Sequence, residues 1–363
     1  MKLIQSAFIT SIVMTLGLVS PALAASGPQD LGTLGGTISA AYGVSRCSKV
    51  IAGNANTPSD ASTHAVIWEG GKVIDLGVFS GGTNSSASGA ASNGSASGTS
   101  DFDDPVNGVV SHAFLYSGGK LQDLGTLGGS QSYGNGIDEF GAVAGYSYTA
   151  NDAATHAFVS NPFHSNQLVD LGTLGGANSA AYGINDFGLV AGASQTTATD
   201  SYGNQISDAV VWSALTKQAF DFGGLGGSFA QLNAINDLGV ATGWADLTGN
   251  STVHAVIGFA GKLTDIGTLG GTYAQGNGIN LAGAVVGFSN TTGDADVHAF
   301  VWTHSGGLVD LNTLLPGGSP WVLTSANGIS DQGEIVGYGT INGESHAFSW
   351  KLAAYGARDC SCK

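Results

Sequence analysis

The chain has 363 residues, a formal net charge of −16 and 42% hydrophobic residues. A surface this acidic repels phosphate backbones, so nucleic acid is excluded as an expected partner. Only 10% of the residues are charged and 59 are glycine, which argues against long surface helices and favours many short strands joined by tight turns.

The first 24 residues have the order of a secretory signal peptide. Lys2 supplies a positive charge, residues 7–19 form an apolar run, and Ala22-Leu23-Ala24 matches a small-residue cleavage site. The run is shorter than the roughly 20 residues that span a membrane, and no comparable run follows. We expect cleavage near Ala24, a secreted protein in the periplasm or outside the cell, and no transmembrane segment.

Three short motifs then recur in fixed order along the rest of the chain. An Asp-Leu-Gly-Thr-Leu-Gly-Gly string or a looser copy begins at Asp30, Asp75, Asp123, Asp170, Asp221, Asp265 and Asp310, at spacings of 44 to 51 residues. A His-Ala element begins at His64, His112, His156, His254, His298 and His346, and the fourth copy reads Asp208-Ala209-Val210. Between them lies a Gly-Ile-Asn-x-x-Gly-x-Val-x-Gly segment, as at residues 183–192. This order predicts seven copies of one repeat.

Each repeat reads as four short antiparallel strands, a to d. Residues 180–184 represent strand a, an Asn-Asp-Phe-Gly turn follows, and residues 189–192 represent strand b. The His-Ala element begins strand c, and residues 262–266 represent strand d. Four antiparallel strands in a repeat of this length are typical of a propeller blade.

The two ends of the repeat region complement one another. The last repeat ends at Trp350 without an Asp-Leu strand, whereas the first Asp-Leu string has no repeat before it. We therefore expect residues 29–33 to supply the missing strand, which would remove two unpaired edges. The sequence predicts an all-β, seven-bladed β-propeller over residues 25–350, closed by the N-terminal strand, with a tail at 351–363. An open β-solenoid or a sandwich is the alternative.

The combination of these motifs from Asp30 to Trp350 resembles the bacterial HAF extracellular repeat family, named for its His-Ala-Phe element. The resemblance implies export and a repeat architecture, and it implies no agreed activity. The second repeat departs most from the pattern, because its residues 88–94 lack the Ile-Asn pair.

Three cysteines occur in a chain that is directed to an oxidising compartment. Cys47 falls in the a–b turn of the first repeat, on the face that also receives the C-terminal tail. We expect a disulfide between Cys47 and either Cys360 or Cys362, which would fasten the ring. A Cys360–Cys362 bond is the competing pairing.

The recurring His and Asp residues are interpreted as structural, because a catalytic group is needed once and a packing contact is needed in every blade. The repeated carboxylate can accept N–H groups of the turn that follows it. Candidate ligand-binding residues are those at which the copies differ, in the b–c loops and the last d–a loop, which share one face. These residues are Asp101, Asp103, Asp104, Tyr202, Asp208, Asp294, Asp296 and Trp321. The alternative is a set of solvated loops.

No catalytic residue, metal site or cofactor is assigned. Calcium is the ion to consider at Asp294-Ala295-Asp296 or within residues 101–104, although neither segment has an EF-hand pattern. The sequence favours a monomeric, secreted binding or surface-associated module for polysaccharide or cell-envelope material. The alternatives are an extracellular carbohydrate-active enzyme that uses Asp and Tyr residues of this face, and a purely structural scaffold.

Overall fold

A computed structural model describes residues 26–161 and 167–356, and the expected signal peptide lies outside this range. The described chain is built almost entirely from short antiparallel strands, with five brief 3₁₀ turns. The strands form four four-stranded sheets and one twelve-stranded sheet. The all-β prediction is therefore confirmed.

Each of the first six repeats contributes four consecutive strands and the last contributes three; we call each such unit a blade and name it by its strands. The first two blades are β2 (Ser39–Val44), β3 (Val50–Asn56), β4 (Thr63–Glu69), β5 (Lys72–Gly77), and β6 (Ser85–Ala90), β7 (Ala96–Asp104), β8 (Gly108–Ser117), β9 (Lys120–Asp123). The next two are β10 (Gly128–Ile137), β11 (Val143–Thr149), β12 (Thr155–Asn161), β13 (Gln167–Gly172), and β14 (Gly175–Ile184), β15 (Leu189–Thr199), β16 (Gln205–Ser213), β17 (Ala219–Gly223).

The remaining strands follow the same plan. They are β18 (Gly226–Ile235), β19 (Ala241–Leu247), β20 (Val253–Phe259), β21 (Lys262–Gly267), then β22 (Gly270–Ile279), β23 (Val285–Thr291), β24 (Val297–Thr303), β25 (Gly307–Asp310), and finally β26 (Trp321–Ile329), β27 (Glu334–Ile341) and β28 (Glu344–Lys351). The 3₁₀ turns are η2 (Pro58–Asp60), η3 (Ala150–Asp152), η4 (Thr292–Asp294), η5 (Leu311–Leu314) and η6 (Ala353–Tyr355).

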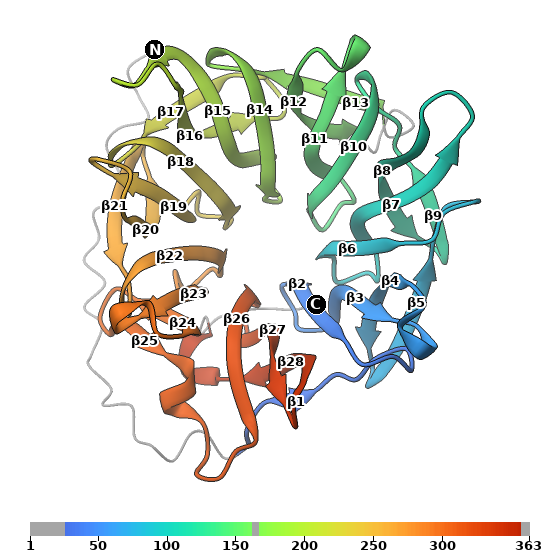
Figure 1. Ribbon diagram of the computed structural model, residues 1–363, viewed down its shortest axis with the longest axis vertical. Coiled ribbons are helices and arrows are strands. Elements are labelled where there is room, and N and C mark those ends of the chain that lie inside the picture. The colour runs from blue at the N-terminus through green and yellow to red at the C-terminus, as the bar shows by residue number, and fades with distance from the viewer. Residues whose placement is uncertain (1–25, 162–166, 357–363) are drawn as a thin grey trace.

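The blades stand around a common centre, with the first strand of each blade innermost (Figure 1). Strand β1 (Gln29–Asp30) pairs antiparallel with β28, so the N-terminal segment completes the last sheet as expected. Strand β2 also contacts β26, β27 and β28, which places the first blade beside the last. Two parallel bridges, Ser207 to Phe229 and Val253 to Tyr273, join the blades of β14–β25 into the twelve-stranded sheet.

The Val-x-Gly element requires glycine at its last position for a steric reason. A Cβ atom added to Gly145 would lie 1.9 Å from the Tyr133 carbonyl oxygen, and one added to Gly243 would lie 1.9 Å from that of Gln231. The first two strands of a blade approach too closely there for any side chain, beside a bulge in the pairing. This element therefore fixes blade geometry.

The core lies between the blades and explains the His-Ala-Phe element. Successive side chains of a strand point to opposite faces of the sheet. Ala113 accordingly packs toward the β10–β13 blade, whereas Phe114 packs toward the β2–β5 blade. Both side chains are fully buried. An alanine fits where the blades are close and a phenylalanine fills the wider side, so each blade supports both of its neighbours.

Candidate functional site

Two of the predicted ligand residues are used to hold turns. The Asp294 carboxylate accepts hydrogen bonds from the Thr272 N–H at 2.7 Å and the Thr272 hydroxyl at 2.9 Å. Asp101 accepts from the N–H groups of Thr83 and Asn84 at 2.6 and 2.8 Å. The backbone bond from Thr272 is the main cause that lowers the pKa of Asp294. These carboxylates clasp the Gly-Gly turn at the start of a blade, and Asp60 and Asp152 do the same in theirs.

Three further predicted residues form no common site: Asp103 and Asp104 end β7, and Asp296 lies four blades further along the chain. Asp104 accepts from the N–H groups of Val106 and Asn107 within its own hairpin turn. Asp103 is in β7, and Asp296 is exposed beyond η4. Among the described residues, no group of three His, Cys, Asp or Glu side chains could hold a metal ion. Neither of the two segments considered for calcium therefore forms part of such a group in the described residues.

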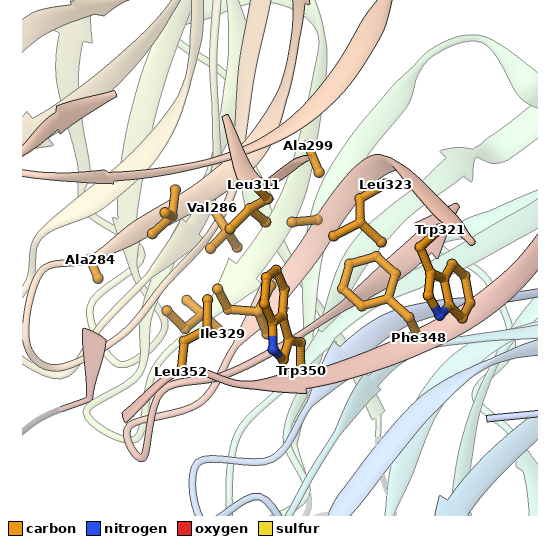
Figure 2. Close-up of a cluster of buried hydrophobic side chains, with 13 residues drawn as sticks. Ala284, Val286, Ala299, Leu311, Trp321, Leu323, Ile329, Phe348, Trp350 and Leu352 are labelled. Atoms are coloured by element: carbon orange, nitrogen blue, oxygen red, sulfur yellow. The ribbon is translucent and has the colours of Figure 1, made fainter. Parts of the chain in front are cut away.

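The remaining predicted residues divide between the surface and the core. Tyr202 is 85% exposed in the turn between β15 and β16. Trp321 is only 6% exposed, and its ring packs edge-on to Phe348 at 6.1 Å in the last hydrophobic cluster (Figure 2). The prediction read Trp321 as a loop residue, whereas it begins β26 and its side chain is directed into the core.

Asp208 occupies the position that histidine holds in the other blades. In six blades the histidine Nδ1 contacts the carboxylate of the Asp-Leu string at 2.7–3.0 Å, and the last pair joins His346 to Asp30 of β1. Asp75 also accepts the Gly77 N–H, as the sequence predicted for this carboxylate. In the β14–β17 blade the pair is Asp208 and Asp221, and burial followed by repulsion from Asp221 raises the pKa of Asp208.

At one end of the central axis, the turns between first and second strands form a ring of polar contacts that we call the collar. Its members are Arg46, Glu139, Asp186, Asp237 and Asp331. Each acidic side chain accepts an N–H from the preceding blade: Glu139 from Ser92, Asp186 from Glu139, Asp237 from Asp186, and Asp331 from Leu281. A cavity in the centre is lined by these residues.

Arg46 reaches across the collar to three blades. Its guanidinium lies 2.5 Å from Asp186, 2.5 Å from Asp237 and 3.0 Å from Asp331. Burial opposes its charge, but the bond to Asp331 and the charge of Asp237 outweigh burial and raise the pKa of Arg46. The collar side chains thus satisfy one another, so this cavity offers a ligand few unused groups.

Away from the collar, along the first two strands of two neighbouring blades, four aromatic side chains form what we call the aromatic row: Phe229, Trp244, Tyr273 and Phe288. Phe229 and Trp244 stack at 5.2 Å with an interplanar angle of 10°, and Tyr273 and Phe288 stack at 5.7 Å and 14°. The Trp244 and Tyr273 rings are 6.5 Å apart and link the two pairs across the blade boundary. Phe229 is exposed and the other three are partly exposed.

Acidic side chains adjoin the aromatic row. The Asp246 carboxylate accepts the Phe229 N–H and acts electrostatically on Tyr273, and burial is the main cause that raises the pKa of Asp246. Asp200 accepts the Ser228 hydroxyl at 2.9 Å and the Tyr202 N–H at 2.9 Å, which places the predicted Tyr202 turn next to the row. Hydrogen bonds from Asn204 lower the pKa of Asp200 to about 2.

The aromatic row was missed because the sequence was compared for what the repeats share. One indication was present: the residue after the Val-x-Gly glycine is Tyr146, Trp244, Phe288 and Tyr338 in four repeats, but Asn54, Thr99 and Ala193 in the others. Tyr146 stacks on Tyr133 at 4.8 Å. That Trp244 meets Tyr273 depends on how two neighbouring blades pack side by side, which no linear pattern displays.

Cys47 has an interaction partner in the structure. Cys360 and Cys362 lie outside the described residues, so the predicted pairing stays a prediction. In the part of the chain that the structure describes, no helix is both long and apolar enough to cross a membrane.

No protein-family model and no curated protein sequence matches the chain. The β-propeller domain of the Trilobed protease from Pyrococcus furiosus aligns with a TM-score of 0.52 and 10% identity, over 85% of this chain and 95% of that domain. The S511A mutant of puromycin hydrolase, complexed with PGG, aligns with a TM-score of 0.55 and 11% identity, over 94% of this chain and 54% of its own length. This chain therefore spans about half of puromycin hydrolase. These likenesses show the β-propeller fold.

The comparisons also correct the functional expectation. The sequence favoured a module for polysaccharide or envelope material, with a carbohydrate-active enzyme or a scaffold as alternatives. The propellers that the chain matches instead belong to a protease and to a hydrolase named for puromycin. The expectation of carbohydrate recognition was wrong because it inferred a ligand from loop carboxylates, and Asp101, Asp104 and Asp294 are used to hold turns.

Proposed function

We propose that this chain is an exported seven-bladed β-propeller of the HAF repeat type that binds cationic segments of polypeptides through the aromatic row. The observation that carries the proposal is the row of two stacked pairs, Phe229 with Trp244 and Tyr273 with Phe288, joined by a tilted contact and lying beside the Asp246 carboxylate. The protein would act as a monomer, because one copy contains the whole row.

Seven blades in a closed ring are supported by the repeat count and by the contacts around the centre. Asn135 donates to the Ala181 carbonyl, Asn233 to Gly276 and Asn277 to Ala326, each time in the next blade. Asn327 of the last blade donates to the Ala41 carbonyl of the first at 2.8 Å. The same contact thus recurs across the junction where the two ends of the repeat region meet.

Export is supported by the sequence of residues 1–24, which has the charge, apolar run and cleavage motif of a secretory signal. The three cysteines agree with an oxidising destination. Mass spectrometry of the protein recovered from culture medium and periplasm should give a mature N-terminus at Ala25, and a retained Met1 in both fractions would contradict export.

The ligand class follows from the chemistry of the aromatic row. Aromatic faces attract Lys and Arg side chains, and a nearby carboxylate strengthens the attraction. Asp246, which accepts the Phe229 N–H, and Asp200, which accepts the Ser228 hydroxyl, provide that negative charge, and the chain as a whole carries −16. The twelve-stranded sheet under the row holds its rings in place, so little ordering entropy is lost on binding.

A polypeptide is preferred over a small cation for two reasons. The row extends across four strands, β18, β19, β22 and β23, which suits an extended chain better than a single group. The similar propellers belong to a protease and a hydrolase, in keeping with a propeller that handles peptide chains.

The test uses three fluorescein-labelled peptides of equal length, with one Gly/Pro/Phe framework and either lysine, serine or glutamate at the variable positions. We expect the mature protein to bind the lysine peptide most tightly and the glutamate peptide least. Trp244→Ala should weaken binding of the lysine peptide by about tenfold or more, because central aromatic residues dominate such interfaces.

Phe187→Ala is the matched control, since Phe187 is 75% exposed in the turn between β14 and β15, at the collar end. This variant should bind as the wild type does. Equal binding by the Trp244 variant and the wild type, or no preference for the lysine peptide, would overturn the proposal.

A further inference from the structure

One of the six His–Asp pairs has a serine hydroxyl as its third member. In the β2–β5 blade, the Ser62 hydroxyl lies 3.3 Å from His64 Nε2, while His64 Nδ1 lies 3.0 Å from both oxygens of Asp75. Asp75 is itself fixed by the Gly77 N–H at 2.8 Å. Serine, histidine and aspartate therefore stand in the order of a nucleophile, its base and the group that orients the base.

The other blades lack this arrangement. The residue two positions before the histidine, or before Asp208, differs in each: Val110, Ala154, Ile206, Thr252, Asp296 and Glu344. Of these, Glu344 approaches its histidine, with an oxygen 3.4 Å from His346 Nε2. A carboxylate at this position has no hydroxyl proton for the imidazole to remove, so it cannot act as a serine does. The His–Asp pair is the repeated structural contact, and the serine is the addition that is specific to one blade.

The reacting side chains are reachable from solvent. Ser62 is partly exposed and the His64 side chain retains 20% of its exposure at the outer part of the blade. The Ser62 hydroxyl also lies 3.0 Å from the Thr57 hydroxyl, which holds it near the imidazole. The 3.3 Å separation from His64 is in the range that such pairs show without a bound substrate.

We propose that Ser62 is a nucleophile activated by His64 and Asp75, and that it hydrolyses acyl esters with good leaving groups. Ser62 Oγ forms a bond to the ester carbonyl carbon as its proton passes to His64 Nε2. Collapse of the adduct breaks the carbon–oxygen bond to the leaving alcohol, which takes that proton. Water then adds to the acyl-serine with His64 as base, releasing the acid and restoring Ser62.

The neighbouring donors explain the restriction to activated esters. The Thr63 N–H, next to the nucleophile, is taken by the Asn84 side-chain oxygen at 3.1 Å. The Thr57 hydroxyl is shared with the Ser62 carbonyl at 3.2 Å. A developing oxyanion thus receives little support from either group, and an oxyanion-hole donor is worth about 10²–10³ in rate. The proposal uses residues separate from the aromatic row and stands or falls independently of peptide binding.

The experiment treats the full mature protein with a biotinylated alkyl fluorophosphonate, which forms an Oγ–P bond with loss of fluoride, and maps the adduct by tandem mass spectrometry. We expect one adduct, on Ser62, together with slow turnover of p-nitrophenyl acetate. Ser62→Ala should abolish both. His64→Ala should lower the labelling rate by about 10²-fold or more, the range for loss of a general base.

His156→Ala is the matched control, because it removes an equivalent His–Asp contact from a blade whose corresponding residue is Ala154. Its labelling rate at Ser62 should stay within about twofold of the wild type. Asp75→Asn provides a second variant of the same triad, and thermal melts show whether each protein is folded. Absence of an adduct on Ser62 in the folded wild type, or equal labelling rates in the His64 and His156 variants, would overturn the proposal.

Discussion

The collar lies in the turns between the first and second strands, whereas the aromatic row lies along these strands, and the two regions use their side chains in opposite ways. In the collar, each carboxylate accepts an N–H from a neighbouring blade, and three of the four also meet Arg46. In the row, the ring faces meet each other but keep exposed surface, with partly buried Asp246 beside them. The polar groups of the collar are bonded to neighbouring blades, whereas the aromatic rings of the row keep exposed surface that a ligand could contact.

The strongest way to break this comparison is to remove the cation of the collar. Arg46→Met leaves the carboxylates of Asp186, Asp237 and Asp331 without their shared partner. Breaking such a pair costs about 3–5 kcal/mol when it is fully buried. Because the Arg46 side chain is 40% exposed, we expect a smaller loss of unfolding free energy, about 1–3 kcal/mol, measured by urea denaturation.

Peptide binding by the folded Arg46 variant should match the wild type, because no residue of the row belongs to the collar. A loss of binding without a loss of stability would place the ligand site in the collar instead.

A second change probes the charge of the row. Asp246→Asn should weaken the lysine peptide by about fivefold and leave the serine peptide unchanged, because only the charged ligand gains from the carboxylate. Burial raises the pKa of Asp246, so its charge is lost at a higher pH than that of an ordinary aspartate. Affinity for the lysine peptide should accordingly fall as the pH is lowered through this raised pKa, and the Asn variant should lack this dependence in fluorescence anisotropy titrations.

A third prediction concerns the pH dependence of stability and the turn-holding carboxylates. The pKa values of Asp60 and Asp294 are lowered, chiefly by backbone hydrogen bonds from Thr37 and Thr272. A folded-state pKa below the unfolded one means that the unfolded chain binds more protons in acid. The stabilisation is thus fully present above about pH 4 and is lost as the pH falls through the lowered values.

Thermal melts from pH 6 to pH 3 should show this loss, and a variant with both Asp60→Asn and Asp294→Asn should show a shallower one. An unchanged slope would mean that other carboxylates govern acid unfolding.

The sequence could predict whatever recurs in every blade. The four strands per repeat, the addition of Gln29 and Asp30 to the last sheet and the turn-binding role of Asp75 all follow from periodicity and local chemistry. Contacts between blades could not be predicted in this way. Arg46 meets Asp186 across 140 positions, and Trp244 meets Tyr273 only because a parallel bridge joins their blades.

The candidate site residues were chosen because they depart from the repeat, and among these they were chosen by residue type. Asp and exposed aromatic residues in loops were selected, although Asp294 was needed by a turn and Trp321 by the core. Ser62 received no attention, because its meaning depends on the distance to His64 Nε2 and on the repeated Asp75 beyond it.

The smallest expected effect concerns the gap in the collar. In four blades, the side chain at the collar position accepts an N–H from the previous blade. The first two blades have Arg46 and Ser92 there, and the β22–β25 blade has Leu281. Leucine has no acceptor for the Asp237 N–H. Leu281→Asn restores an acceptor without adding a fifth acidic side chain, whereas Leu281→Ala removes the same apolar atoms and restores nothing. A net hydrogen bond contributes about 0.5–1.5 kcal/mol. The Asn variant should therefore exceed the Ala variant in unfolding free energy by about that amount, and equal stability of the two would show that the collar gains nothing from a further acceptor beside Asp237.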